Sequence, residues 1–92
     1  IATVLGAGGA ARAIVFSLIK AGFSEVRIAN RTFARAQALK DRFQGPASAH
    51  EWQSVEDLLV DSDLLVNTTS IGLNPGKDPA TPDLSGMTNQ FW

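Results

Sequence analysis

The chain has 92 residues, which suits one domain with one hydrophobic core. With 45% hydrophobic residues, 18% charged residues and a net charge of −1, it has an ordinary globular composition without the basic surface of nucleic-acid-binding proteins. The absence of cysteine and the single histidine exclude a disulfide framework and thiolate or histidine-rich metal sites. No apolar run reaches the about 20 residues of a membrane helix, so we expect a cytoplasmic protein without a metal, membrane or nucleic-acid partner.

The first elements predict one strand–helix–strand unit. Residues 1–5 form an apolar run that is too short for a helix and is typical of a buried parallel strand. After a glycine-rich turn, apolar residues recur at three- and four-residue spacing over 10–21, and Gly22 supplies a helix stop. Residues 25–30 alternate polar and apolar positions and predict a second strand. Because the chain begins in a strand and without methionine, we expect it to be cut from a longer polypeptide at both ends.

The following residues continue the alternation of helices and strands. A second helix is expected after Thr32, which can cap it, and should end at the Gln-Gly-Pro sequence of residues 44–46. A third strand is predicted at residues 47–50 and a brief helix, capped by Ser54, at 54–60. A fourth strand is predicted at 64–68, and it is followed by a Pro/Gly-rich loop at 71–87. This alternation predicts an α/β fold of the doubly wound, Rossmann-like type, in three α/β/α layers with strand order 3-2-1-4.

The glycine-rich turn matches a known fingerprint for dinucleotides. Its sequence has the form G-x-G-x-x-A and stands between a predicted strand and a predicted helix, as that motif requires. Gly6 permits a tight turn, Gly8 lets the backbone approach a pyrophosphate, and Ala11 lets the helix pack closely on the sheet. Amide groups at the helix N-terminus would meet the phosphate charge. We therefore predict a phosphate-binding loop formed by Gly6, Ala7, Gly8, Gly9, Ala10 and Ala11.

The end of the second strand indicates which dinucleotide is bound. NAD-binding domains carry an Asp or Glu there, whereas this chain has Asn30, then Arg31 and Thr32, and Arg35 one helical turn later. Two guanidinium groups and a hydroxyl can converge on a 2′-phosphate, and one charge-assisted hydrogen bond of ~1.5–3 kcal/mol gives about a 10- to 150-fold preference. The pattern predicts NADP, with Arg31 the stronger candidate and Arg35 equally compatible with a solvated residue. Arg12, a cation in the first turn of the first helix, has no assigned role.

Three segments together resemble the C-terminal NADP-binding domain of shikimate dehydrogenases. They are the glycine loop at residues 6–13, the Asn-Arg-Thr motif with the arginine behind it at 30–36, and the sequence Asn-Thr-Thr-Ser-Ile-Gly at 67–72. The last motif is the most discriminating, because glycine loops are widespread and Asn-Arg-Thr also occurs in glutamyl-tRNA reductases. The resemblance implies that the last motif leaves the fourth strand beside the nicotinamide ribose, with Thr68 at the cofactor. It also implies that residues 73–87 lead to a next strand.

By this resemblance the parent enzyme reversibly reduces 3-dehydroshikimate to shikimate with NADPH, a step in aromatic amino-acid biosynthesis. In the family the catalytic Lys and Asp and the substrate pocket lie mainly in a separate N-terminal domain, and no residue here matches them. Residues 1–92 are thus expected to be an incomplete NADP-binding domain, without the substrate domain and the closing segment, and inactive alone. The alternatives are a quinate/shikimate dehydrogenase using NAD or NADP, and a non-catalytic regulatory module of similar sequence. Glutamyl-tRNA reductase is a weaker alternative, because residues 67–70 fit that family less well.

Three further features are interpreted as structural. His50 has no carboxylate at helical or strand spacing, which favours a structural or solvent-facing histidine. Trp52 stands near an element end, where large aromatic residues usually cover the core. Residues 61–63 cannot all point at one metal ion and are predicted to form the turn before the fourth strand.

Overall fold

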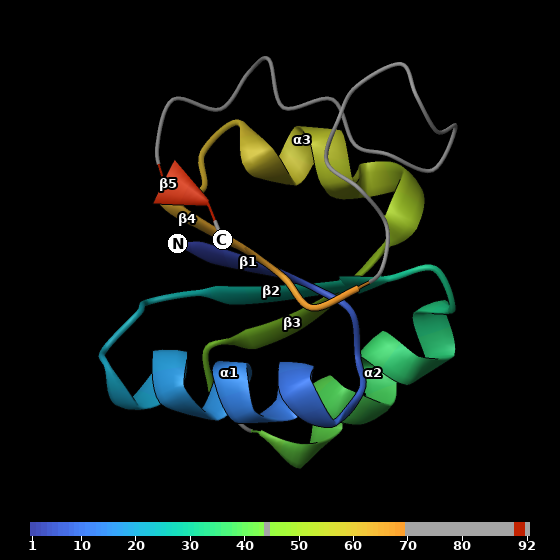
Figure 1. Cartoon of the computed structure of the whole chain (residues 1–92), viewed down its shortest axis with the longest axis horizontal. Coiled ribbons are helices and arrows are strands. Elements are labelled where there is room, and N and C mark those ends of the chain that lie inside the picture. Colours follow the sequence, from blue (N-terminus) through green and yellow to red (C-terminus); the bar gives the residue numbers. More distant parts are fainter. Residues whose placement is uncertain (44, 70–89, 92) are drawn as a thin grey trace.

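The protein is a five-stranded parallel sheet with helices on both faces (Figure 1). The computed structural model describes residues 1–43, 45–69 and 90–91. The sheet order is β3-β2-β1-β4-β5, and the strands span Ala2–Leu5 (β1), Val26–Asn30 (β2), Ala47–Glu51 (β3), Leu64–Asn67 (β4) and Gln90–Phe91 (β5). The predicted order 3-2-1-4 is therefore confirmed, and β5 adds a strand next to β4. The predicted loop at 71–87 lies outside the described residues.

Helices lie on opposite sides of the sheet, which confirms the three-layer architecture (Figure 1). One face carries α1 (Gly9–Lys20) and α2 (Phe33–Arg42), and the other carries α3 (Val55–Leu59), which follows the 3-10 turn η1 (Trp52–Ser54). The predicted stop of α1 is confirmed, because Gly22 has a φ of +95° and its amide donates to the carbonyl oxygen of Ile19.

Both predicted helix caps are wrong in their hydrogen bonds. Thr32 and Ser54 occupy the N-cap positions, but neither side chain bonds to a helix amide within the described residues. The backbone carbonyl oxygen of Thr32 accepts two hydrogen bonds instead, one from the Asn30 side-chain amide and one from the Arg35 backbone amide. Ser54 has helical backbone angles because η1 runs straight into α3, so it lacks the extended geometry of a capping residue.

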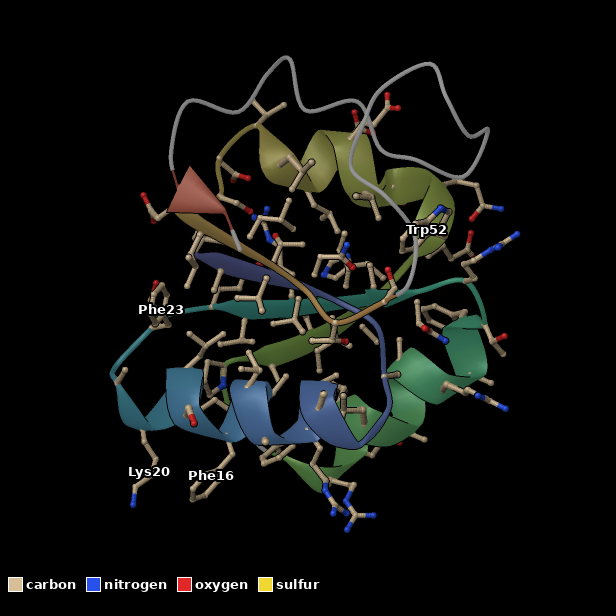
Figure 2. All side chains as sticks on the ribbon, viewed as in Figure 1. Phe16, Lys20, Phe23 and Trp52 are labelled. Carbon is tan, nitrogen blue, oxygen red and sulfur yellow. The ribbon has the colours of Figure 1, made fainter. Side chains whose placement is uncertain are left out.

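Alternate strand positions fill two separate cores. Residues Val4 and Ile28 point toward α1 and α2, where they meet Val15 and Leu39 among other buried side chains. On the opposite face, the core consists of Leu5, Ala29, Val55, Leu58, Leu59 and Leu65. Trp52 packs against this second core, as predicted (Figure 2). Each fully buried Leu or Ile contributes ~1.5–3 kcal/mol, so burial on both faces stabilises the sheet.

Polar contacts on the α3 face hold the turn before β4 in place. The Arg27 guanidinium, on β2, donates to both carboxylate oxygens of Asp61, at 2.6 and 3.1 Å, and to the carbonyl oxygen of Leu58 at 2.9 Å. The buried hydroxyls of Thr3 and Ser62 lie 2.5 Å apart. The predicted turn at 61–63 is confirmed, and its Asp61 carboxylate pairs with the Arg27 guanidinium of the protein itself. No group of metal-ligating side chains was found in the described part of the chain, and none of its helices is long and apolar enough to cross a membrane.

Candidate functional site

The turn out of β1 requires glycine for two reasons. Gly6 has a φ of +109°, a conformation that L side chains rarely adopt, and its amide donates to the carbonyl oxygen of Ala29 at 2.8 Å. A Cβ atom at this position would overlap with the hydroxyl of Thr68 and lie 3.3 Å from a methyl carbon of Thr69. The tight turn predicted at Gly6 is confirmed, and its close neighbour is the segment that follows β4.

The next residues leave open space above the start of α1. A Cβ atom added at Gly8 or at Gly9 would meet no atom of the described residues within 4 Å. Ala11 is fully buried in the core on the α1 side, which agrees with the close helix packing expected of a small residue there. The Arg12 amide donates to the Gly8 carbonyl oxygen, and the helix amides before it have no intrahelical acceptor. The loop can therefore accept an anionic group close to its backbone.

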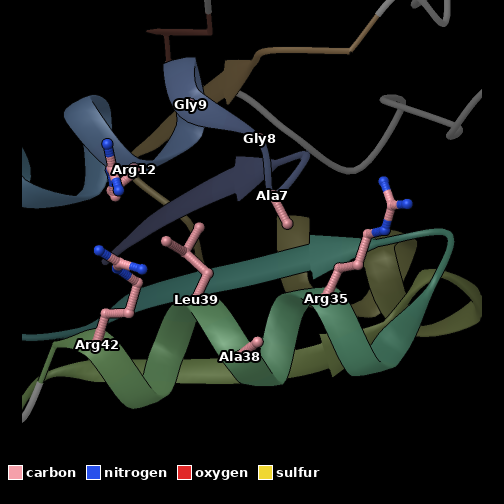
Figure 3. Close-up of a pocket in the computed structure, with 8 residues that line it drawn as sticks. All are labelled: Ala7, Gly8, Gly9, Arg12, Arg35, Ala38, Leu39 and Arg42. Carbon is pink, nitrogen blue, oxygen red and sulfur yellow. The ribbon is translucent and has the colours of Figure 1, made fainter.

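A pocket of about 410 Å³ lies between this loop and α2 (Figure 3). The loop contributes Ala7, Gly8 and Gly9, and α2 contributes Ala38 and Leu39. Three guanidinium groups complete the lining: Arg12 comes from α1, and Arg35 and Arg42 come from α2. In Figure 3, Arg35 stands at the Ala7 end of the pocket, while Arg12 and Arg42 stand at the opposite end.

The charge of this pocket is not neutralised by the surrounding protein. Within the described residues, no carboxylate forms an ion pair with Arg12, Arg35 or Arg42. The first turn of α1 also contains no acidic residue. Three exposed cations around one concave surface produce a positive potential that attracts anions, most strongly those that can accept two hydrogen bonds from a planar guanidinium.

The structure brings together some of the predicted phosphate-binding residues. Arg35 lies in the pocket beside the glycine loop, as expected for a residue one turn into α2. Asn30 ends β2, and its side-chain amide donates to the Thr32 carbonyl oxygen at 3.0 Å. Arg31 and Thr32 are exposed, and neither belongs to the described lining of the pocket. The choice of Arg31 as the stronger candidate stays a prediction.

Arg42 was missed in the sequence. It lies seven positions after Arg35, on the same face of α2, because seven residues are close to two helical turns. That spacing was the available signal.

The segment after β4 lies against the glycine turn. The Thr68 hydroxyl donates to the Leu5 carbonyl oxygen at 2.7 Å, and the Thr68 amide donates to the same oxygen at 2.9 Å. The Asn67 side-chain oxygen accepts from the amide of Thr69 at 2.9 Å. Thr68 thus borders the predicted loop, whereas residues 70–72 of the motif lie outside the described part of the chain. Contact of Thr68 with a cofactor stays a prediction.

Fold and site together define a doubly wound, Rossmann-like α/β domain with a cationic pocket beside its glycine loop. The model of the family described as shikimate / quinate 5-dehydrogenase matches residues 1–73. The chain therefore belongs to the shikimate / quinate 5-dehydrogenase family.

Relatives and solved structures agree with this membership. The chain is 56% identical over 78 residues to a shikimate dehydrogenase (NADP(+)) of Chelativorans sp. (strain BNC1), covering 85% of this chain and 28% of that protein. It is 52% identical to the Mesorhizobium japonicum protein of that name, and the match covers 96% of this chain and 33% of that protein. The chain thus spans about a third of the length of these relatives.

Two solved structures illustrate the range of similar folds. A quinate dehydrogenase from Corynebacterium glutamicum in complex with NAD superposes with a TM-score of 0.78 at 27% identity, covering 95% of this chain and 32% of that one. A shikimate 5-dehydrogenase from Thermus thermophilus in complex with NADP(H) and shikimate has a TM-score of 0.61 at 40% identity, covering 88% and 30%.

Proposed function

We propose that residues 1–92 form the NADP-binding domain of a shikimate dehydrogenase, an enzyme that reversibly reduces 3-dehydroshikimate to shikimate. The observation that carries the proposal is the position of Arg35 in a cationic pocket beside the glycine loop, with Asn30 rather than an acid at the end of β2. An Asp or Glu at that strand end would repel a 2′-phosphate, whereas an arginine attracts it. The NADP(+) relatives, at 45–56% identity, add support.

The residues present fit this cofactor. Open space over Gly8 and Gly9 leaves room for a pyrophosphate next to the α1 amides, and Arg35 is free to pair with a 2′-phosphate. The proposed contacts come from the loop, the end of β2, the start of α2 and the end of β4: Gly6, Ala7, Gly8, Gly9, Ala10, Ala11, Asn30, Arg31, Thr32, Arg35 and Thr68. When bound, NADPH supplies the hydride for the reduction.

The role of this chain in the reaction is to bind and orient. The loop amides would hold the pyrophosphate, the arginines would hold the adenosine end, and Thr68 would lie beside the nicotinamide ribose. We assign no catalytic residue to the chain, and we propose that the small-molecule substrate and the proton-transferring groups are held mainly by a separate N-terminal domain in a cytoplasmic enzyme. Accordingly, the 92-residue chain alone should reduce no NADP in the presence of shikimate, and measurable turnover would contradict this division of roles.

Calorimetric titration with NADPH and with NADH tests the cofactor assignment. We expect the protein to prefer NADPH by about 10-fold or more, and Arg35→Ala to remove most of this preference while leaving NADH affinity unchanged. Arg31→Ala measured in parallel decides which of the two arginines contributes more. Lys40→Ala is the matched control, because it removes a positive charge from α2 without touching the pocket. Equal affinity of the unsubstituted protein for both cofactors would overturn the assignment.

The second candidate is a quinate/shikimate dehydrogenase that uses NAD or NADP. It is favoured by the TM-score of 0.78 with the NAD-bound quinate dehydrogenase. Equal binding of NADH and NADPH would support it. A regulatory module that binds the cofactor without turnover is distinguished by the absence of a Lys/Asp pair from the domain that accompanies this chain in the full polypeptide.

A further inference from the structure

Arg12 and Arg42 form a pair that faces across the groove between α1 and α2. Both side chains line the pocket beside the glycine loop, at the end opposite Arg35 (Figure 3). Both also line an adjoining pocket of about 420 Å³, together with Phe16 and Phe43, whose ring centroids are 6.4 Å apart. The two arginines therefore contribute to the lining of both hollows.

The protein's own charges do not explain this pair. Among the described residues, Asp41, the acid beside Arg42 in the sequence, is paired with Lys40, and Asp61 is paired with Arg27. Arg12 occupies the first turn of α1, where the helix dipole disfavours a cation. Two like charges on facing helices also repel each other. An oxyanion between them would reverse both unfavourable effects.

We propose that Arg12 and Arg42 are specificity-determining residues that bind the 2′-phosphate of NADP together with Arg35. This inference rests on the proposed function and extends its phosphate site from the end of β2 to the α1–α2 groove. Arg35 and Arg42 lie about 10 Å apart along the axis of α2, and Arg12 faces them from α1, so the three flexible side chains surround one hollow from different directions. A dianionic phosphate has enough acceptor oxygens to bind more than one guanidinium at a time.

Adenine nucleotides that differ in the 2′-phosphate test this directly. Calorimetry with 2′,5′-ADP and with 5′-AMP separates the contribution of the 2′-phosphate from that of the adenosine and the 5′-phosphate. We expect Arg12→Ala and Arg42→Ala each to weaken 2′,5′-ADP binding about 5-fold, with 5′-AMP binding unchanged. This loss lies between that expected for an exposed ion pair and that expected for a charge-assisted hydrogen bond. Both residues are exposed and helical, so alanine should leave the fold intact, which circular dichroism verifies.

Two further variants separate specific binding from general attraction. Lys40→Ala, which removes the same charge from α2 outside the pocket, should change 2′,5′-ADP affinity by less than about 2-fold. Arg42→Lys keeps the charge but loses the planar donor pair, so its affinity should fall between those of the unsubstituted protein and Arg42→Ala. Equal weakening of 5′-AMP and 2′,5′-ADP, or an effect of Lys40→Ala as large as that of Arg42→Ala, would overturn the proposal.

The outcome also distinguishes this inference from the proposed function. If the unsubstituted protein binds 2′,5′-ADP and 5′-AMP equally, the NADP assignment itself fails. If it prefers 2′,5′-ADP and only Arg35→Ala reduces that preference, the NADP assignment stands and the role of Arg12 and Arg42 is rejected.

Discussion

The hydroxyl of Thr68 lies over Gly6, in the place that a side chain of residue 6 would occupy. It is held there by its hydrogen bond to the Leu5 carbonyl oxygen, which also accepts from the Thr68 amide. Residues 6–11 and 67–69 are about sixty positions apart in the sequence and meet because β1 and β4 are neighbours in the sheet. The two motifs are therefore one structural unit at the carboxyl ends of these strands.

Gly6→Ala should destabilise the protein by about 2–5 kcal/mol. The new methyl group has to adopt a positive φ and overlaps with Thr68, and each of these effects costs on the order of 1–3 kcal/mol. Urea unfolding followed by tryptophan fluorescence measures the change in the free energy of unfolding. Gly9→Ala is the control, because it has open space and an ordinary φ, and it should change stability by less than about 1 kcal/mol. A similar cost for both substitutions would contradict the close contact.

The contact between these residues also predicts a coupling. In a Thr68→Ala background the overlapping hydroxyl is gone, so Gly6→Ala should cost less than in the unsubstituted protein, by about 1 kcal/mol or more. A double-mutant cycle of unfolding free energies gives this value. Strict additivity would mean that the positive φ alone accounts for the requirement for glycine.

Gly8→Ala should separate binding from stability. A Cβ atom at Gly8 meets nothing within 4 Å in the described structure, and the residue has a φ of −87°, so stability should change by less than about 1 kcal/mol. The same methyl group would project from the loop that lines the pocket, and we expect about a 10-fold or greater loss of NADPH affinity. Unchanged affinity in a calorimetric titration would show that the cofactor does not approach this part of the backbone.

Patterns of apolar residues were sufficient to predict the sheet. The short run at residues 1–5 and the alternation at 25–30 depend only on which side chains must be buried, and burial is the largest favourable term in folding. The strand β5, Gln90–Phe91, is too short to show any periodicity, and it was the family resemblance that implied a strand after residue 87. The turn η1 was missed, because Ser54 is a common cap type and sequence does not reveal that a 3-10 turn precedes it.

The candidate site was only partly predictable for a different reason. The glycine loop and Arg35 are defined by local sequence, at a strand end and in the first turn of a helix. Arg12 and Arg42 become neighbours only when α1 and α2 pack side by side on the sheet, so their pairing depends on tertiary structure. The stronger role predicted for Arg31 stays a prediction, because adjacency to a strand does not determine the direction of a side chain.

Asp61→Asn should reduce the loss of stability at acidic pH, which is the acid limb of a plot of the free energy of unfolding against pH. Arg27 lowers the pKa of Asp61 below its ordinary value, chiefly through hydrogen bonds to the carboxylate. A carboxylate with a lowered folded-state pKa stabilises the protein fully above the unfolded pKa of about 3.9, and this contribution disappears as pH falls through the folded pKa. Urea unfolding between pH 6 and pH 2 should therefore show a smaller loss of stability in Asp61→Asn than in the unsubstituted protein.

Arg27→Met provides the control for this pH dependence. Without the guanidinium, Asp61 titrates near its ordinary pKa in both states, so adding Asp61→Asn should no longer alter the acid limb. Arg27→Met itself should destabilise the protein at neutral pH by about 2 kcal/mol, because it also removes the bond to the Leu58 carbonyl oxygen. An acid limb that still responds to Asp61→Asn in the Arg27→Met background would mean that another cation controls Asp61.

His50 should titrate below its ordinary pKa of about 6.5. Burial is the main cause of the lowered pKa, and the positive charge of Arg27 adds to it, while Glu25 acts in the opposite direction. The imidazole Nε2 atom lies 2.8 Å from the Ser48 hydroxyl, which can donate to the neutral ring. Because His50 is the single histidine of the chain, its ring resonances in an NMR titration report this pKa without ambiguity. Arg27→Met should raise the midpoint.

The stability consequence has a definite sign. The unfolded chain binds a proton at His50 more readily than the folded protein, so the free energy of unfolding should fall as pH drops below about 6.5 and level off above about pH 7. The slope cannot exceed about 1.4 kcal/mol per pH unit, which is the limit for one proton. In His50→Gln, which keeps a hydrogen-bonding side chain next to Ser48 but does not titrate, the change between pH 7 and pH 5 should be smaller. If both proteins lose the same stability over this range, His50 is not protonated preferentially in the unfolded state.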